Sequence, residues 1–247
     1  MRLRVGAWTS AGQRRSDNQD FLLYRIRTVE PDAVRDCSLF VAADGVGGAA
    51  GGAIASKLAA ETLAEHFPRR GGPDPAAALV SAAQAAARAV AEEAATDAGL
   101  ANMGTTLVAV VVRDGAYWMA NIGDSRGYLI REGTARQVTE DHSYVAEEVR
   151  AGRMSVADAS VSLYRHVITR SIGGEEAVQP DIFGPEPLQP GDRLLLCTDG
   201  LTDTMEDDEI ARVAAKGDAE SAARALVDEA NRLGGPDNIS VLLVAVV

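Results

Sequence analysis

The sequence predicts an α+β fold in which antiparallel strands form layers packed against helices. Apolar runs of strand length, rich in β-branched and aromatic residues, are concentrated at the two ends and in the middle of the chain. Two long helical patterns follow one another without a strand between them, so the regular alternation of strands and helices in a parallel sheet is absent. With 47% hydrophobic residues among 247, residues 1–247 are expected to form a single domain with a sizeable core.

Eight segments have the length and composition of strands. Two of them are separated by Asp114-Gly115, and both residue types tolerate the positive φ angles of a tight hairpin turn. These two segments are therefore expected to be antiparallel neighbours. The predicted strands are residues 3–9, 20–28, 37–43, 105–113, 116–122, 126–131, 193–198 and 239–246.

Three helices are predicted between these strands. The first spans residues 52–67, and the second spans 75–98, where Asp74 is a suitable N-cap and Pro75 takes the first helical position. The third spans residues 218–233 and ends at a Gly-Gly-Pro sequence that cannot continue a helix. The spacing predicts that the inward-facing side chains are Ile54, Leu58, Leu63 and Phe67 in the first helix, and Ala222, Leu226, Ala230 and Leu233 in the third.

The segment 139–175, called the flap below, differs from the rest of the chain because it is charged, weakly periodic and bracketed by strands. Helices over residues 141–150 and 155–160 would make it a small surface subdomain. Long insertions of this kind are often lids or substrate-facing loops. We therefore expect the flap to contribute to substrate selection.

The charge of the chain argues against one broad class of function. Lysine and arginine number 24 against 36 aspartate and glutamate residues, which gives a formal net charge of −12. Extensive binding to nucleic-acid phosphates is therefore not expected. A phosphorylated substrate would need a local source of positive charge.

Cysteine usage and hydropathy indicate a reducing compartment. Cys37 and Cys197 lie in apolar runs, where buried free thiols are expected rather than a disulfide framework. The first residues lack the apolar run of a signal peptide, and no stretch approaches the ~20 apolar residues that span a bilayer. We therefore expect a cytoplasmic protein without membrane association.

A glycine-rich sequence after the predicted strand 37–43 matches the G-x-G-x-x-A pattern of dinucleotide-binding folds at Gly45, Gly47 and Ala50. Asp44 would place a carboxylate where the pyrophosphate of a dinucleotide binds. The helix that follows leads to another helix instead of a second parallel strand. A dinucleotide site is therefore not expected.

A second short pattern, Gly123-Asp124-Ser125-Arg126-Gly127, matches the nucleophile elbow of serine hydrolases. An elbow requires a helix directly after the serine, whereas the residues after Ser125 have the composition of a strand. We therefore expect Ser125 to be a buried or turn residue. Arg126 is expected to support the Asp124 turn through a local ion pair.

Aspartates at strand ends are the strongest signal of a functional site. Asp44 and Asp199 each follow a predicted strand, Asp237 precedes another, and Asp20 begins a fourth. Carboxylates gathered at strand ends repel one another unless cations lie between them, and an all-oxygen ligand set suits Mg²⁺ or Mn²⁺. Zinc is disfavoured, because the three histidines and two cysteines show no ligand spacing.

Seven short motifs occur along the chain in a characteristic order. They are Gly12-x-x-Arg15-x-x-Asn18-Gln19-Asp20, Ala43-Asp44-Gly45-Val46-Gly47-Gly48, Gly104-Thr105-Thr106, Gly123-Asp124-Ser125-Arg126, Val167-Ile168-Thr169-Arg170, Thr198-Asp199-Gly200-Leu201-x-Asp203 and Asp237-Asn238-Ile239-Ser240. From residue 6 to its C-terminus the chain resembles the metal-dependent protein phosphatases, the type 2C serine/threonine phosphatases of the PPM family, and looks like a bacterial stand-alone catalytic domain. The resemblance implies a β-sandwich of two mostly antiparallel sheets with helices on both outer faces.

The resemblance also implies a two-metal site built from five residues. Asp44 would bridge two Mn²⁺ or Mg²⁺ ions, and the Gly45 carbonyl would bind one of them. Asp199 and Asp237 would ligate the other ion, with Asp20 nearby through a coordinated water. The catalytic role is thereby assigned to Asp44, Asp199 and Asp237, acting through a water that bridges the ions.

Three further residues receive roles from the resemblance. Asp124 and Asp203 match the positions that hold a weaker third ion in bacterial members. Arg15 matches the residue that binds the phosphate, and its planar guanidinium can donate to two phosphate oxygens at once. The metals and Arg15 would supply the positive charge that the chain as a whole lacks.

The chain departs from the family pattern near these residues. Val46 stands where eukaryotic-type members have a histidine suggested as a general acid, and Gln19 replaces the acidic residue that many members carry before Asp20. Neither change touches the core aspartates, so catalytic competence is expected. His142 and His166 are not expected to take part in catalysis.

The implied activity is hydrolysis of phosphoserine and phosphothreonine in proteins by direct attack of the metal-bridging water. No covalent enzyme intermediate is needed. The expected partners are phosphorylated proteins, including a cognate serine/threonine kinase and its substrates, and the chain is expected to be a monomer. The alternative is a non-catalytic phosphoprotein-binding regulator on the same fold, against which the three core aspartates argue.

Overall fold

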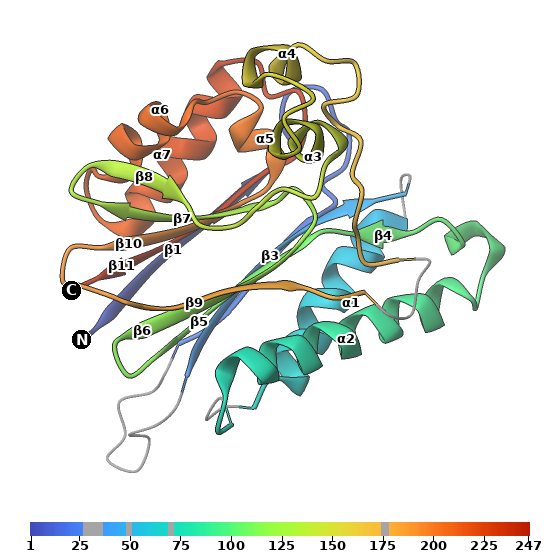
Figure 1. The fold of residues 1–247 in the computed structure, drawn as a ribbon, viewed down its shortest axis with the longest axis horizontal. Helices are drawn as coiled ribbons and strands as arrows, with labels where there is room; N and C mark the ends of the chain where they lie inside the picture. Colours follow the sequence, from blue (N-terminus) through green and yellow to red (C-terminus); the bar gives the residue numbers. More distant parts are fainter. Residues whose placement is uncertain (27–36, 48–50, 69–71, 174–177) are drawn as a thin grey trace.

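The structure is a computed structural model that describes residues 1–26, 37–47, 51–68, 72–173 and 178–247. The end of the predicted strand 20–28, Gly48 and Ala50 of the glycine-rich motifs, and the last residues of the flap lie outside these ranges. The described residues form four layers, with two antiparallel sheets packed face to face between two layers of helices (Figure 1). The predicted fold class is therefore confirmed.

The first sheet joins strands that are far apart in the sequence. Its five strands lie in the order β1-β11-β10-β7-β8, and each is antiparallel to its neighbours. β1 pairs with β11 along its whole length, from Leu3 opposite Val246 to Ser10 opposite Ile239. The strands are β1 (Leu3–Ser10), β7 (Arg126–Arg131), β8 (Thr134–Gln137), β10 (Arg193–Cys197) and β11 (Ile239–Val246).

The second sheet has the order β2-β3-β5-β6-β9, and the short strand β4 also pairs with β3. The predicted hairpin between β5 and β6 is confirmed, because Asp114 and Gly115 have φ angles of 51° and 82° and form the two-residue turn. The strands are β2 (Asp20–Arg25), β3 (Ser38–Val46), β4 (Gly104–Thr105), β5 (Leu107–Arg113), β6 (Ala116–Ile122) and β9 (Asp181–Pro187).

Helices cover the outer face of each sheet (Figure 1). α1 (Gly51–His66) and α2 (Pro75–Ala94) pack on the second sheet, and a 3₁₀ turn (Ala98–Leu100) follows them. α6 (Asp207–Ala214) and α7 (Ala219–Arg232) pack on the first sheet, with the short α5 (Asp199–Thr202) at the end of β10. The flap contributes α3 (Tyr144–Arg150) and α4 (Val156–Ser160) at one end of the sandwich.

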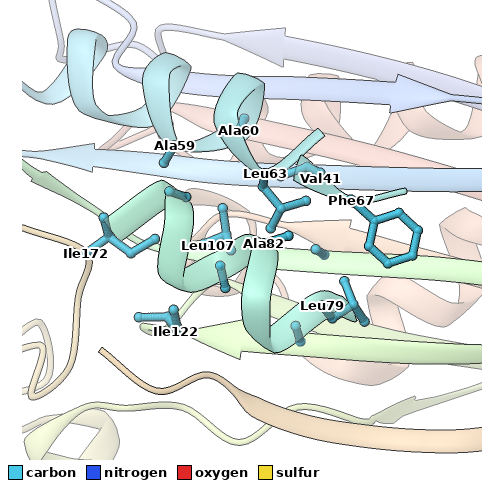
Figure 2. Close-up of a cluster of buried hydrophobic side chains, with 14 of the residues drawn as sticks. Val41, Ala59, Ala60, Leu63, Phe67, Leu79, Ala82, Leu107, Ile122 and Ile172 are labelled. Atoms are coloured by element: carbon cyan, nitrogen blue, oxygen red, sulfur yellow. The ribbon is translucent and has the colours of Figure 1, made fainter. Parts of the chain in front are cut away.

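Three apolar clusters hold the four layers together. One lies between the two sheets and includes Phe40, Val110 and Leu242. The other two lie between a sheet and its helices, one beneath α1 and α2 (Figure 2) and one beneath α5, α6 and α7. Cys37 and Cys197 are buried in these outer clusters as free thiols, as expected. In the part of the chain that the structure describes, no helix is both long and apolar enough to cross a membrane.

The predicted inward faces of two helices need correction. Ile54 of α1 is 38% exposed, whereas Ala55, Ala59 and Leu63 are buried. These small alanines allow α1 to approach both the sheet and α2 closely, which rotates the helix away from the face that the large side chains predict. In α7 the predicted face is buried except for Leu233, which is the C-cap residue and 42% exposed.

Candidate metal centre

A cleft of about 680 Å³ opens where the two sheets meet the flap. Asp44 reaches it from β3 of the second sheet, whereas Asp199 and Asp237 reach it from the ends of β10 and β11 in the first sheet. Asp124 and Asp203 also line it. The structure therefore brings together seven of the eight residues predicted for the site, namely Arg15, Asp44, Gly45, Asp124, Asp199, Asp203 and Asp237.

The eighth residue, Asp20, lies opposite Asp44 in the register of β2 and β3. Its Oδ2 accepts a hydrogen bond of 2.9 Å from the hydroxyl of Thr198, which in turn accepts one of 3.0 Å from the backbone N–H of Ser240. Asp20 thus connects the two sheets directly behind the cleft.

The backbone of Asp44 is fixed by the two threonines of the Gly104-Thr105-Thr106 motif. The N–H of Asp44 donates to Thr106 Oγ1 at 3.0 Å, and its carbonyl accepts from Thr105 Oγ1 at 2.8 Å and from the N–H of Thr106 at 2.9 Å. Thr106 Oγ1 is also 2.7 Å from the hydroxyl of Ser125, which is completely buried. Ser125 is therefore a buried structural residue, as expected, and β7 follows it instead of a helix.

Asn238 holds the loop that carries Arg15 against the start of β11. Its amide nitrogen donates to the carbonyls of Ala11 and Asp17 at 3.1 and 2.8 Å, and its amide oxygen accepts from the N–H of Gln19 at 2.8 Å. This role was not predicted from the sequence, although Asn238 belongs to one of the seven motifs. A buried amide with three backbone partners sets the position of the whole loop.

Arg15 makes an ion pair with Asp237 across the mouth of the cleft. Its Nη2 is 2.7 Å from Asp237 Oδ2, and 58% of its side chain is exposed. The hydrogen bond to Asp237 and the negative charges of Asp237, Asp199 and Asp44 raise the pKa of Arg15. A permanently charged, accessible guanidinium beside a cluster of aspartates is suited to binding a phosphate oxygen.

The aspartates of the cleft resist ionisation because burial removes them from water. Burial raises the pKa of Asp20 and of Asp124 to about 6, and the charges of neighbouring aspartates add to this effect. Burial also raises the pKa of Asp44 and Asp199 well above the ordinary value of 3.8, reinforced by the charges of Asp20 and Asp124. The native arrangement is thus electrostatically unfavourable without a compensating cation.

The same aspartates contain carboxylate oxygens that lack protein partners. Asp20 Oδ1, Asp124 Oδ1 and Asp199 Oδ1 are buried and accept no hydrogen bond. Unpartnered buried acceptors are costly unless another group binds them. Carboxylate and carbonyl oxygens are the ligands that Mg²⁺ and Mn²⁺ prefer, so these residues fit hard divalent cations.

We expect the metal-free protein to become less stable as the pH rises from about 4 to above 6. Asp20 and Asp124 take up protons more readily in the folded state, because their folded pKa of about 6 exceeds the ordinary 3.8. Their contribution is complete below pH 3.8 and is lost as the pH passes 6, a change of about 3 kcal/mol for each residue when it titrates fully. Urea unfolding in EDTA at pH 5 and pH 7.5 measures it.

Two controls accompany this pH measurement. In EDTA, Asp124→Asn should make the free energy of unfolding depend less on pH. With Mn²⁺ the wild-type protein should instead become more stable as the pH rises, because cations bind the deprotonated ligands. Equal free energies of unfolding for the wild-type protein at the two pH values in EDTA would contradict the strained carboxylate cluster.

The ion pair predicted for Arg126 is made with Asp141 at the base of the flap. It comprises hydrogen bonds of 2.9 and 3.0 Å from Nε and 2.7 Å from Nη2. Asp124 lines the cleft, whereas Arg126 begins β7. This bidentate pair fixes the flap to the first sheet.

His142 has a structural role at the same place. It is 2% exposed, its Nδ1 accepts from the N–H of Gly123 at 2.9 Å, and its Nε2 is 2.9 Å from Asp181. Both ring nitrogens of His142 thus have protein partners, and the ring holds the turn before Asp124.

His166 was given no role in the sequence analysis, but the structure places it in the wall of the cleft. Its Nδ1 is 3.5 Å from Asp203 Oδ2. No sequence spacing links a lone histidine in the flap to Asp203, because the two come together only through the fold of the flap.

Comparisons with known proteins agree with this geometry. The sequence profile of the family described as Protein phosphatase 2C matches residues 9–230. The serine/threonine protein phosphatase PstP of Mycobacterium tuberculosis is 35% identical over 99% of this chain, which spans only 45% of the length of that relative.

Two solved structures match nearly the whole chain. The serine/threonine phosphatase of S. agalactiae has a TM-score of 0.90 and 32% identity, with complete coverage of both chains. The catalytic domain of PstP, solved in complex with two manganese ions, has a TM-score of 0.87 and 34% identity, with coverage of 99% of this chain and 98% of that one.

Proposed function

Because the chain belongs to the protein phosphatase 2C family, we propose that it is a metal-dependent phosphatase that hydrolyses phosphoserine and phosphothreonine in proteins. The observation that carries this proposal is the cleft itself. It gathers aspartates from both sheets, leaves three of their buried oxygens without protein partners, and places an accessible arginine at its mouth. A hard cation and a phosphate group together satisfy these groups.

The proposed ligands form two sets. Asp44 would contact both ions of a two-ion centre and the Gly45 carbonyl one of them, whereas Asp199 and Asp237 would hold the other ion with Asp20 nearby. Two divalent cations, when bound, lower the pKa of a water between them and neutralise charge on the phosphoryl oxygens. Mn²⁺ and Mg²⁺ both suit the all-oxygen ligand set.

The residues of the chain then position the substrate. Arg15 donates to phosphoryl oxygens and holds the phosphate at the mouth of the cleft. The hydrogen bonds of Thr105, Thr106 and Asn238 fix the Asp44 backbone and the Arg15 loop, so little reorganisation is needed when the phosphate binds. A third cation is proposed at Asp124 and Asp203.

The experiment that tests this function is hydrolysis of p-nitrophenyl phosphate and of a phosphothreonine peptide with Mn²⁺, with EDTA, and after Mn²⁺ is restored. Turnover should require the metal and recover with it. Absence of metal-dependent turnover in well-folded protein would favour the alternative, a non-catalytic phosphoprotein-binding module on the same fold.

We expect Arg15→Ala to raise KM for a phosphate monoester about tenfold, because the variant loses roughly one charge-assisted hydrogen bond to the phosphate. The effect on kcat should be smaller, because Arg15 contacts the bound phosphate and the cations act on the bond that breaks. Steady-state kinetics at saturating Mn²⁺ measures both parameters. Arg14→Ala is the matched control, since Arg14 is an exposed neighbour that does not line the cleft. An unchanged KM would remove Arg15 from the site.

The flap is proposed to select among phosphoproteins, because the metal centre contacts only the phosphoryl group. It exposes several apolar side chains, including Val161 at 77% and Leu163 at 92% exposure, and the nearby Arg165 lines the cleft. Such residues are available to contact a peptide on either side of the phosphorylated residue.

We expect the double variant Val161→Ser, Leu163→Ser to lower kcat/KM for phosphopeptides about tenfold, equivalent to the loss of one or two partly buried apolar side chains. Hydrolysis of p-nitrophenyl phosphate should stay within about twofold. Ile26→Ser, on an exposed aliphatic residue outside the flap, is the control. Shortening the flap between Asp141 and Tyr164 should likewise lower kcat/KM for phosphopeptides far more than for p-nitrophenyl phosphate. Equal losses on both substrates would mean that the flap supports the fold.

The partners follow from the same chemistry. We propose that the substrates are phosphorylated proteins, including a cognate serine/threonine kinase and its targets, and that the chain acts as a monomer in the cytoplasm. Its buried free cysteines support a reducing compartment.

A further inference from the structure

His166 is the one histidine of the described chain that lines the aspartate cleft. It belongs to a segment of the flap, Arg165 to Ile168, that forms the wall facing Asp199 and Asp203. This segment is fixed to the base of the flap, because the N–H of Tyr144 donates to the carbonyl of Val167 at 2.8 Å and the N–H of Thr169 donates to the carbonyl of His142 at 2.9 Å. The position of His166 therefore follows the position of the flap.

The arrangement around His166 has the dimensions of a cation site. One ligand atom from each of His166, Asp199 and Asp203 lies within 4.8 Å of the other two. Nitrogen and oxygen ligands at ~2.1 Å from a divalent ion are at most ~4.2 Å apart, so the three ligand atoms have to move closer together when they share one coordination sphere.

A second observation points to a ligand at the same place. Asp124 lines the cleft, is 8% exposed, and its Oδ1 is buried without a hydrogen-bond partner. Among the neighbouring carboxylates, Asp124 contributes most to the raised pKa of Asp199, and Asp203 contributes the next largest amount. Three mutually repelling carboxylates thus line the same cleft as His166, and one imidazole cannot satisfy all of their oxygens.

We propose that His166 is a nitrogen ligand of the cation held by Asp124, Asp199 and Asp203, so that the flap supplies one side of this third site. The proposal rests on the proposed function for the two-ion centre beside it. An imidazole ligand favours Mn²⁺, Zn²⁺ or another transition cation over Mg²⁺, which prefers oxygen ligands alone. The third site therefore differs in metal preference from the two all-oxygen core positions, and its occupancy stabilises one position of the flap.

Nitrogen coupling in the electron spin resonance of bound Mn²⁺ tests the ligand directly. The core ligands supply only oxygen, so a directly bonded nitrogen can come only from His166 among the residues that line the cleft. We expect this coupling in wild-type protein with Mn²⁺ added to saturation. It should disappear in His166→Asn and persist in His66→Asn, a matched change at an exposed histidine of α1. Its absence from saturated wild-type protein would overturn the proposal, whatever the variant does.

Calorimetric titration gives a readout independent of both spectroscopy and activity. His166→Asn should weaken the lowest-affinity Mn²⁺ event at least about tenfold, since even a change beside a metal ligand costs 10–100-fold in affinity, and should leave the tighter events unchanged. The same variant should bind Mg²⁺ at that site as wild type does. Equal Mn²⁺ affinity in both proteins would overturn the assignment of His166. If the wild-type protein showed no tighter Mn²⁺-binding events at all, the two-ion centre of the proposed function would be contradicted instead.

Discussion

Replacing Asp44 with asparagine is expected to lower kcat by ~10³-fold or more at saturating Mn²⁺, a loss of about 4 kcal/mol of transition-state stabilisation. Asp44 is proposed to contact both core ions, and a neutral amide removes the charge that holds them. Asp199→Asn and Asp237→Asn should also lower kcat by orders of magnitude, because each changes a proposed ligand of the second ion. Steady-state assays with p-nitrophenyl phosphate and a phosphopeptide measure these losses.

The Asp44→Asn variant carries its own folding control. Burial and neighbouring charges raise the pKa of Asp44 well above its ordinary value, so the charged residue destabilises the metal-free protein. The amide should therefore raise the free energy of unfolding in EDTA while it abolishes activity. A variant that retained nearly wild-type kcat would show that Asp44 is not a core ligand.

Gly45→Ala is expected to destabilise the protein by about 3 kcal/mol and to impair metal binding as well. A methyl group on Gly45 would lie 2.2 Å from the carbonyl oxygen of Gly52 and 2.7 Å from that of Gln19. Both obstacles are backbone atoms, so β3, α1 or the Gln19 loop has to move. Any such movement displaces the Gly45 carbonyl, which is proposed to bind one of the ions.

Urea unfolding in EDTA and calorimetric Mn²⁺ titration measure the two effects of Gly45→Ala separately. The control is Gly99→Ala, since Gly99 is exposed in the 3₁₀ turn and a methyl group there would meet only the side chain of Asp97 at 3.3 Å. Unchanged stability for Gly45→Ala would mean that the approach of α1 to β3 is looser than the structure indicates.

The sequence predicted those parts of the fold in which composition and local chemistry agree. The Asp114-Gly115 turn and the apolar strands on either side of it follow directly from residue type. β9 was missed because Asp181–Pro187 contains two prolines and a glycine and has no apolar alternation. The short α6 was also missed, although its three acidic first-turn residues suit a helix N-terminus.

The site could be predicted as a set of residues but not as an arrangement. Motif order identified the aspartates and Arg15, which the fold then brings to one cleft. The contacts of Arg126 with Asp141, of Asn238 with the Gln19 loop, and of His166 with Asp203 each join segments with no fixed sequence spacing. Only the packing of the flap and the loops decides which of these side chains meet.

The pairing of β1 with β11 determines when during synthesis this cleft can form. Thr198 holds Asp20, Asn238 holds the Gln19 loop, and β11 joins β1 to β10, so both sides of the cleft depend on residues 198–246. A ribosome adds about 5–20 residues per second, and such long-range contacts close slowly. Until residue 246 has emerged, Arg15 and the proposed ligands Asp199 and Asp237 lack the contacts that fix their positions. We therefore expect the assembled cleft to be absent from a growing chain until residues 198–246 have been translated.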